Sequence, residues 1–233
     1  MKKIKINVKT KNSNYPIIIG SGLIKKLSKV FDDNSLKFNK CLLIIDNKIP
    51  KKFINKIIKS LKNKEKTICY FNASEKNKSM VSINKILDLL LKKNFHRNDC
   101  VISIGGGITG DVSGFVSSMF KRGIKFINIP TTLLAQIDSS IGGKTGINSK
   151  YGKNLIGSFY QPNLVLTDVD FLKTLPKREI ICGYAEILKH SLISSKKFFL
   201  FLNKNASKIL NLKTPYIEKS IKGSCLIKKN IIQ

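Results

Sequence analysis

Short apolar runs alternate with amphipathic helical patterns along most of this chain, and this alternation constrains its fold more than any other feature. Residues 41–45 form an apolar run that ends at Asp46, and residues 100–104 form another that leads into three glycines. Strands and helices that alternate in this way form parallel sheets with helices on both faces. We therefore predict an α/β fold with a mostly parallel sheet. The predicted strands are residues 4–8, 17–19, 41–45, 67–71, 100–104, 125–129 and 164–167, and the helices among them are residues 23–31, 50–61 and 82–93.

The pattern changes after residue 167, where the strand signals stop. Helical spacing continues through residues 178–194, 197–210 and 215–232. We place a domain boundary near Lys177, which divides the chain into an α/β domain at residues 1–177 and a helical part at residues 178–233. At the other end, the first two strands are expected to pair around a turn at residues 12–14.

The net charge of +29 first suggests a nucleic-acid partner, but its distribution argues against one. The basic residues are 40 lysines and only three arginines, whereas nucleic-acid surfaces usually recruit arginine for bidentate contacts. Residues 99–190 hold ten basic and seven acidic residues, so most of the excess lies outside this segment. We interpret the charge as solvated lysine-rich faces that would also attract an anionic small substrate.

The five cysteines are far apart and show no CxxC spacing, which predicts reduced thiols and excludes a disulfide framework or a zinc knuckle. The apolar runs are too short to cross a bilayer, and the lysine-rich N-terminus lacks the apolar stretch of a signal peptide. The sequence therefore predicts a cytoplasmic protein.

The glycine-rich segment GGGITGD, residues 105–111, follows a predicted strand and opens a helix. Glycines let the backbone approach a pyrophosphate, and a helix N-terminus stabilises its charge. The segment also fits an ordinary tight turn, and no acid ends the following strand. Asp46, at the end of an earlier strand, is the available partner for a ribose hydroxyl.

Residues 130–157 combine five glycines with the hydroxyl residues Thr131 and Thr132 and with the glycine-flanked lysines Lys144 and Lys153. Lysines and hydroxyls next to glycines suit anionic oxygens. We interpret the segment as an anion site, with a plain flexible loop as the alternative.

Glu186, Lys189 and His190 lie at helical spacing and share one face. They could form a metal carboxylate with a catalytic lysine, or a surface ion pair. A catalytic zinc takes about three protein ligands, and the chain has only two histidines, so from its residues alone the metal site is incomplete. The other histidine, His96, is interpreted as structural.

Together these segments resemble the 3-dehydroquinate synthase family of the shikimate pathway. The resemblance covers essentially the whole chain and is densest in GGGITGD (105–111), RGIKFINIPTTLLAQIDSSIGGKTGIN (122–148), GKNLIGSFYQP (152–162), FLKTLP (171–176) and GYAEILKH (183–190). Several long motifs in the same order make it specific.

The resemblance implies an N-terminal Rossmann-like NAD-binding domain, the start of an all-α metal and substrate domain, and a homodimer. It implies catalytic NAD, a divalent metal (Zn or Co), and the conversion of 3-deoxy-D-arabino-heptulosonate 7-phosphate to 3-dehydroquinate and phosphate. In this reaction a ring carbinol is oxidised, phosphate is eliminated, the ketone is reduced again, and ring opening and aldol closure follow. NAD is regenerated in each cycle.

The resemblance also implies roles for individual residues. The implied cofactor contacts are Asp46, Ala73, Ser74, Glu75, Lys76, Asn77, Lys78, Gly106, Gly107, Ile108, Thr109, Gly110, Asp111, Thr131, Thr132, Asp138, Lys144, Lys153, Phe171, Leu172, Lys173 and Thr174. The implied catalytic and substrate contacts are Asp138, Lys144, Asn154, Lys189 and Lys228, with Arg122 reaching the substrate phosphate of a neighbouring subunit. Glu186 corresponds to the first metal ligand.

Some positions depart from the family pattern. Ala73 and Ser74 stand where a glycine commonly precedes the glutamate, and Thr109 and Gly146 replace common aliphatic and alanine positions. The family's two metal-binding histidines, and an arginine and an asparagine used on the substrate, lie in a segment after the position of Lys228. Residues 1–233 do not contain that segment, so the resemblance predicts a C-terminally truncated, inactive chain. Members often carry histidine at the position of His190 without using it as a ligand.

Three alternatives to this synthase remain open. The chain could be a related sugar-phosphate cyclase, since part of the specificity lies in the missing segment. It could be a non-catalytic NAD-binding remnant. A basic nucleic-acid-binding protein is disfavoured by the scarcity of arginine.

Overall fold

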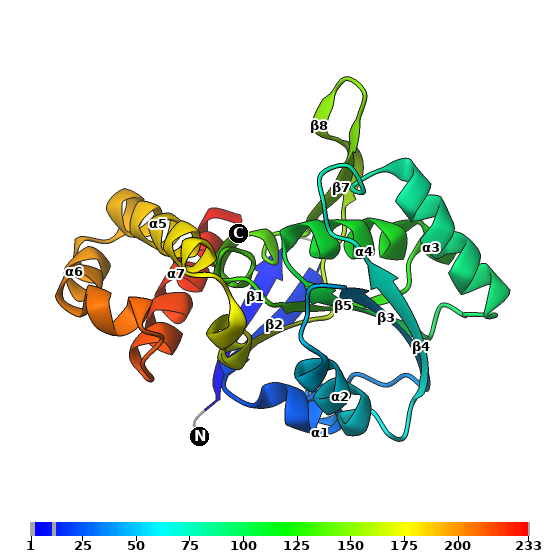
Figure 1. Cartoon of the computed structure of the whole chain (residues 1–233), viewed down its shortest axis with the longest axis horizontal. Coiled ribbons are helices and arrows are strands. Elements are labelled where there is room, and N and C mark those ends of the chain that lie inside the picture. The colour runs from blue at the N-terminus through cyan, green and yellow to red at the C-terminus, as the bar shows by residue number, and fades with distance from the viewer. Residues whose placement is uncertain (1–2, 11–12, 233) are drawn as a thin grey trace.

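The computed structural model describes residues 3–10 and 13–232, and a seven-stranded sheet forms its centre (Figure 1). The strand order is β1-β2-β9-β6-β5-β3-β4. β1 (Ile4–Thr10) and β2 (Ser13–Gly20) are antiparallel, and every other neighbouring pair in this sheet is parallel. The predicted α/β fold with a mostly parallel sheet is confirmed. The other strands of the sheet are β3 (Lys40–Asp46), β4 (Glu65–Phe71), β5 (Cys100–Gly105), β6 (Lys125–Pro130) and β9 (Leu164–Asp168).

β9 lies between β2 and β6, although it follows them in the chain by a long interval. Val165 is in register with Ile17 of β2 on one side and with Asn128 of β6 on the other. The N-terminal hairpin therefore joins the rest of the sheet only through β9.

The two faces of the sheet are covered by different helices (Figure 1). Side chains alternate along a strand, so Leu43 packs with α1 (Leu27–Asp32) and α2 (Lys51–Ser60). Leu42 points to the other face, where it packs in a core with α3 (Met80–Lys92) and α4 (Gly107–Met119). Both faces are apolar, as expected for a parallel sheet.

Three helices form the C-terminal part: α5 (Lys177–Ser194), α6 (Lys196–Leu210) and α7 (Tyr216–Ile232). Their apolar faces share a core with β1 and β2, in which Ile17, Ile187 and Ile221 are buried. The predicted boundary coincides with the first residue of α5, and the division into two domains stays a prediction. In the part of the chain that the structure describes, no helix is long and apolar enough to cross a membrane.

The N-terminal region differs in detail from the predictions. Residues 23–31 do not form one α-helix, because a 3-10 helix (Leu23–Lys26) precedes α1. Asn14 lies within β2, paired with Lys9, where a turn was predicted. Residues 11 and 12 of that predicted turn lie outside the described residues.

A hairpin that the sequence did not predict projects from the sheet (Figure 1). It consists of β7 (Lys144–Ser149) and β8 (Gly152–Phe159), which pair antiparallel. Two of its glycines are explained by packing. A Cβ on Gly157 would lie 2.0 Å from the carbonyl oxygen of Thr145, and one on Gly146 would lie 2.5 Å from that of Ile156. Strands that must approach this closely need glycine, and glycine obscures the alternation that marks a strand.

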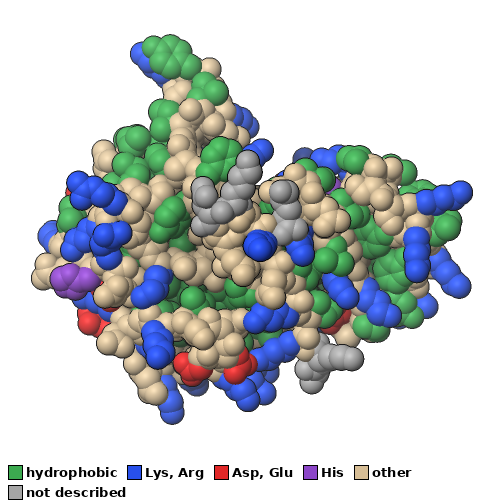
Figure 2. Space-filling model, turned by 180° about the vertical axis from the view of Figure 1, so that it is seen from behind, with side chains coloured by type: hydrophobic (Ala, Val, Ile, Leu, Met, Phe, Trp, Pro, Cys, Tyr) green, Lys and Arg blue, Asp and Glu red, His purple; other side chains and the backbone are tan. Residues whose placement is uncertain are grey.

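The surface agrees with the interpretation of the charge. Figure 2 shows basic side chains spread over one face of the molecule, interspersed with other residues, without gathering into one stripe. All five cysteines are free thiols, and Cys41, Cys100 and Cys225 are buried. Burial raises the pKa of the Cys41 thiol to about 12, so this side chain is an unreactive part of the core.

Candidate functional site

The carboxyl ends of β3 and β5 form the edge of the sheet at which a nucleotide is expected. The chain continues from β3 to β4 on one side of β3 and later returns to β5 on its other side. Ligands of open α/β sheets bind at such a switch point. Asp46 ends β3 there, and its side chain is largely buried while accepting a hydrogen bond from the backbone N–H of Lys48 at 3.0 Å.

The glycine-rich turn after β5 leads directly into α4. Gly106 is the N-cap residue, and Gly107 begins the helix. A Cβ on Gly105 would lie 2.4 Å from Thr109 Oγ1, and one on Gly107 would lie 3.0 Å from Ser139 Oγ. A Cβ on Gly106 would lie 3.3 Å from the methyl group of Thr132. The turn therefore has room for a backbone and no side chain, and it leaves the first N–H groups of α4 open to an anion.

A cavity of about 510 Å³ brings together four of the six predicted catalytic residues. Asp138 comes from a one-turn π-helix (Ala135–Ser139), Lys144 and Asn154 from the hairpin, and Lys228 from α7. Lys228 Nζ pairs with Asp138 Oδ1. Leu155 and Phe159 add exposed apolar surface to the same cavity. π-Helical turns recur at functional sites, which suits the position of Asp138.

Lys78 links the cofactor side of this region to the cavity. Its ammonium is buried and lies 2.5 Å from Asp111 Oδ2 and 2.5 Å from Asn154 Oδ1. Burial raises the pKa of Asp111, and the contact with Lys78 opposes this effect. Asp111 also lines the cavity. The predicted cofactor loop at residues 73–78 thus contacts a predicted substrate residue.

Glu186 lies on α5 between two possible partners. Its Oε1 is 2.5 Å from Lys189 Nζ and 3.2 Å from His190 Nε2. His190 is buried, its Nδ1 contacts Ser224 Oγ, and burial lowers its pKa, which favours a neutral imidazole. Asp138, Glu186 and His190 each offer a ligand atom, all within 4.8 Å of one another. The family resemblance assigned only Glu186 to the metal. Helical spacing already predicted that His190 lies near Glu186, and the structure adds Asp138 to this pair.

Three other predicted site residues, Arg122, Phe171 and Leu172, do not line the cavity of about 510 Å³. Arg122 is exposed and lines a separate surface hollow of about 600 Å³ with Arg97 and Lys125. Its backbone has a φ of 62° and lies in the tight turn between α4 and β6, next to Lys121 and Gly123, which also have positive φ. Phe171 and Leu172 are buried in the apolar cores, so only their backbone is available to a cofactor.

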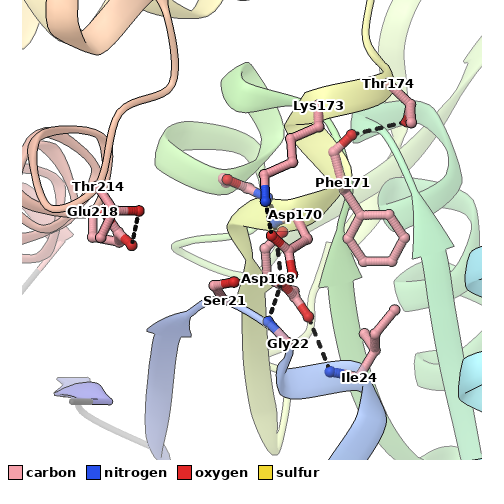
Figure 3. A network of polar contacts seen from close by, with 11 residues as sticks. Ser21, Gly22, Ile24, Asp168, Asp170, Phe171, Lys173, Thr174, Thr214 and Glu218 are labelled. Atoms are coloured by element: carbon pink, nitrogen blue, oxygen red, sulfur yellow. Dashed lines mark hydrogen bonds and ion pairs between the residues drawn. The ribbon is translucent and has the colours of Figure 1, made fainter. Parts of the chain in front are cut away.

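A buried carboxylate anchors the backbone directly before the predicted cofactor stretch at residues 171–174 (Figure 3). Asp168 ends β9 and is fully buried. It accepts hydrogen bonds from the backbone N–H groups of Gly22, Ile24 and Asp170, each at 3.0 Å. Burial raises its pKa, and the backbone donors oppose this effect. Asp168 was not among the predicted residues, although it ends a strand as Asp46 does.

Asn148 is a second residue that the sequence analysis did not single out. It lies in β7 and contacts both the loop at residues 73–78 and Asn154. The local sequence around Asn148 does not indicate a functional role, because the residues that Asn148 contacts in the loop at residues 73–78 are far away in the sequence.

The chain is similar in sequence to 3-dehydroquinate synthases over nearly its whole length. The 3-dehydroquinate synthase N-terminal family model matches residues 68–182, and the C-terminal model of the same synthase matches residues 183–233. A 3-dehydroquinate synthase from Pelagibacter ubique is 63% identical over 230 residues, which cover 99% of this chain and 62% of the relative. One from Desulforamulus reducens is 40% identical, over 98% of this chain and 64% of the relative. The chain thus spans somewhat less than two thirds of the length of these relatives.

Solved structures share the fold. A 2-deoxy-scyllo-inosose synthase complexed with carbaglucose-6-phosphate, NAD⁺ and Co²⁺ superimposes with a TM-score of 0.84 at 24% identity, covering 98% of this chain and 63% of its own. The 2-epi-5-epi-valiolone synthase of Streptomyces hygroscopicus subsp. jinggangensis, with NAD⁺ and Zn²⁺ bound, gives a TM-score of 0.84 at 25% identity, covering 94% of this chain and 61% of its own.

Proposed function

Because this chain belongs to the 3-dehydroquinate synthase family, we propose that it carries the NAD site and much of the active site of an enzyme that converts 3-deoxy-D-arabino-heptulosonate 7-phosphate to 3-dehydroquinate and phosphate. One observation carries this proposal. Four residues with predicted catalytic roles, from the π-helix, the hairpin and α7, line one cavity next to the N-terminus of α4.

The residues present fit NAD. The N-terminus of α4, which begins at Gly107, suits a pyrophosphate on its N–H groups, and the Asp46 carboxylate can accept hydrogen bonds from ribose hydroxyls. When bound, NAD supplies a reversible hydride acceptor. Lys78 and Asp111 form an ion pair between the predicted cofactor loop and the cavity. We propose that this arrangement orients the carbinol carbon for reaction.

The cationic side chains of the cavity suit a substrate that carries a phosphate and a carboxylate. Lys144 and Lys228 both line it, and Asn154 adds an amide. Lys228 and Lys189 are paired with Asp138 and Glu186. A substrate anion that binds the lysine of such a pair frees the carboxylate for a metal ion, and a metal ion that binds the carboxylate frees the lysine for the substrate. Substrate binding and metal binding are therefore expected to support each other.

The donor set also fits a divalent metal. Glu186, Asp138 and His190 offer two carboxylates and an imidazole, which are suitable ligands for Zn or Co. The 3.2 Å between Glu186 Oε1 and His190 Nε2 suits two ligands of one ion. When bound, the metal supplies Lewis-acid stabilisation of the developing alkoxide. We propose Glu186 as the principal ligand.

Replacing Glu186 by glutamine is expected to weaken Co²⁺ binding to the 233-residue chain at least tenfold, because the amide oxygen has no charge to offset that of the ion. The measurement is a titration followed by the absorption of bound cobalt and by calorimetry. Glu179→Gln is the matched control, since Glu179 is exposed on the first turn of the same helix. Equal binding by wild type and Glu186→Gln would contradict the assignment.

The proposed activity is tested by the release of phosphate from 3-deoxy-D-arabino-heptulosonate 7-phosphate in the presence of NAD and Zn²⁺ or Co²⁺. The 233-residue chain is compared with the same chain extended by the corresponding C-terminal segment of the Pelagibacter ubique relative. We expect phosphate and 3-dehydroquinate from the extended chain in equal amounts, without net NADH, and little turnover from the short chain. An extended chain that binds NAD and metal but leaves the substrate intact would refute the proposal.

A related sugar-phosphate cyclase is the alternative, favoured by the solved structures that share the fold. The same assay with other phosphorylated sugars separates the two functions. We further propose a homodimer in the cytoplasm, with no nucleic-acid or membrane partner. The exposed position of Arg122 outside the cavity supports a role toward a second copy.

A further inference from the structure

Asn148 makes four hydrogen bonds that join two segments far apart in the sequence. Its backbone N–H donates to the carbonyl of Lys78 at 2.8 Å. Its side-chain Nδ2 donates to the Glu75 carbonyl at 3.1 Å and to Glu75 Oε2 at 2.7 Å. Its Oδ1 accepts from the backbone N–H of Asn154 at 3.1 Å. One side chain therefore contacts the predicted cofactor loop and the predicted substrate hairpin together.

The local backbone explains why Asn148 is free to do this. The register between β7 and β8 shifts between Ile147 and Ser149, so Asn148 is not paired across the hairpin with a residue of β8. A β-bulge of this kind turns a residue away from its own ladder. Only an amide side chain offers both the donors that face Glu75 and the acceptor that faces Asn154.

Asn154 is the residue on which the two connections converge. Its backbone N–H is held by Asn148, and its side chain accepts from Lys78, the last residue of the cofactor loop. Its φ of 58° places it in the left-handed region, which asparagine adopts more readily than most other non-glycine residues. The hydrogen bond from Asn148 also lowers the pKa of Glu75, which keeps this acceptor charged.

We propose that Asn148 is a positioning residue that couples the cofactor loop at residues 73–78 to Asn154, so that a bound cofactor orders the hairpin that lines the cavity. This inference rests on the proposed function, because it requires the loop to bind NAD. The hairpin projects from the sheet and has an exposed tip, so a cofactor that fixes the loop can also restrict the hairpin.

Hydrogen–deuterium exchange of the 233-residue chain, with and without saturating NAD, tests the coupling. In the wild type we expect NAD to slow exchange in peptides from residues 73–78 and also from residues 144–159. In Asn148→Ala we expect the response of the loop to remain, the response of the hairpin to fall at least threefold, and the NAD Kd to rise about tenfold. Ser149→Ala is the matched control, since the Ser149 hydroxyl contacts only the turn of its own hairpin.

A second variant tests the contact itself. Asn148→Asp places a carboxylate against that of Glu75 and should uncouple the hairpin further than Asn148→Ala does. Glu75→Gln places an amide donor opposite the carboxylate of Asn148→Asp. The double variant should therefore regain much of the hairpin response that Asn148→Asp loses, and Glu75→Gln alone is measured to complete the cycle. Asn148 lies on the hairpin, outside the core of the sheet, so the variants should keep the wild-type melting temperature.

The outcomes separate this inference from the proposed function. A wild-type chain without saturable NAD binding refutes the function and with it the coupling. A wild type that binds NAD and slows exchange in the loop alone, or an Asn148→Ala variant with the full hairpin response, overturns the coupling and leaves the function intact.

Discussion

Replacing Gly107 by valine is expected to weaken NAD binding by about a hundredfold or more, which corresponds to about 2.8 kcal/mol. Gly107 is the first residue of α4, and a Cβ there already comes within 3.0 Å of Ser139 Oγ. The two methyl groups of valine would extend into the space through which a pyrophosphate must approach the N–H groups of the helix. Calorimetric titration with NAD measures the effect.

Two alanine substitutions show whether the size of the side chain at position 107 causes the loss of NAD affinity. Gly107→Ala should bind NAD with intermediate affinity, because it adds only the Cβ. Gly20→Ala is the control, since a Cβ at the end of β2 would make ordinary contacts with Leu23 at 3.5 Å. Wild-type affinity in Gly107→Val, at an unchanged melting temperature, would place the cofactor elsewhere.

Asp168→Ala is expected to lower the free energy of unfolding by about 3 kcal/mol or more, the largest effect on stability among the variants proposed. Three backbone N–H groups donate to this carboxylate, and each loses its acceptor in the variant. For a chain of this size the loss corresponds to a fall of about 6–12 °C in Tm. Thermal and urea unfolding followed by circular dichroism measure it.

Two further variants show whether the buried acceptor causes the loss. Asp168→Asn keeps the shape and one acceptor oxygen, so it should fall between wild type and Asp168→Ala. Asp33→Ala should change stability by less than about 0.5 kcal/mol, because the contact of Asp33 with Lys3 is long, at 3.5 Å, and exposed. Comparable losses in Asp33→Ala and Asp168→Ala would contradict this account.

Most of the fold was predictable because the core strands are continuous apolar runs. The runs at residues 41–45 and 100–104 are apolar and end at turn residues, and both became central strands. The hairpin at residues 144–159 was not predictable in the same way. Its strands are mostly exposed and need glycine for close approach, so neither face shows an apolar stripe.

The sequence indicated which residues could form the candidate site, but it gave no information on the contacts among them. The family resemblance implied substrate roles for Asp138, Asn154 and Lys228, and the structure places all three at one cavity, while the roles stay predictions. Asn148 was not singled out because it acts through groups distant in the sequence, and such partners leave no local pattern. Asp168 was not singled out although it ends a strand, as Asp46 does. The approach of His190 to Glu186 follows from helical spacing, but that spacing is equally common in surface ion pairs.

The position of β9 has a consequence for the order of events during synthesis. Until residues 164–168 leave the ribosome, the β1–β2 hairpin has no neighbour in the sheet, and β6 presents an open edge. Unpaired parallel edges are prone to pair with other chains, and contacts of long sequence separation form slowly. The sheet can therefore be completed only after β9 is available to pair with β2 and β6, and Asp168 can then accept the hydrogen bonds from Gly22 and Ile24. A nascent chain that stalls before this point would be a substrate for chaperones.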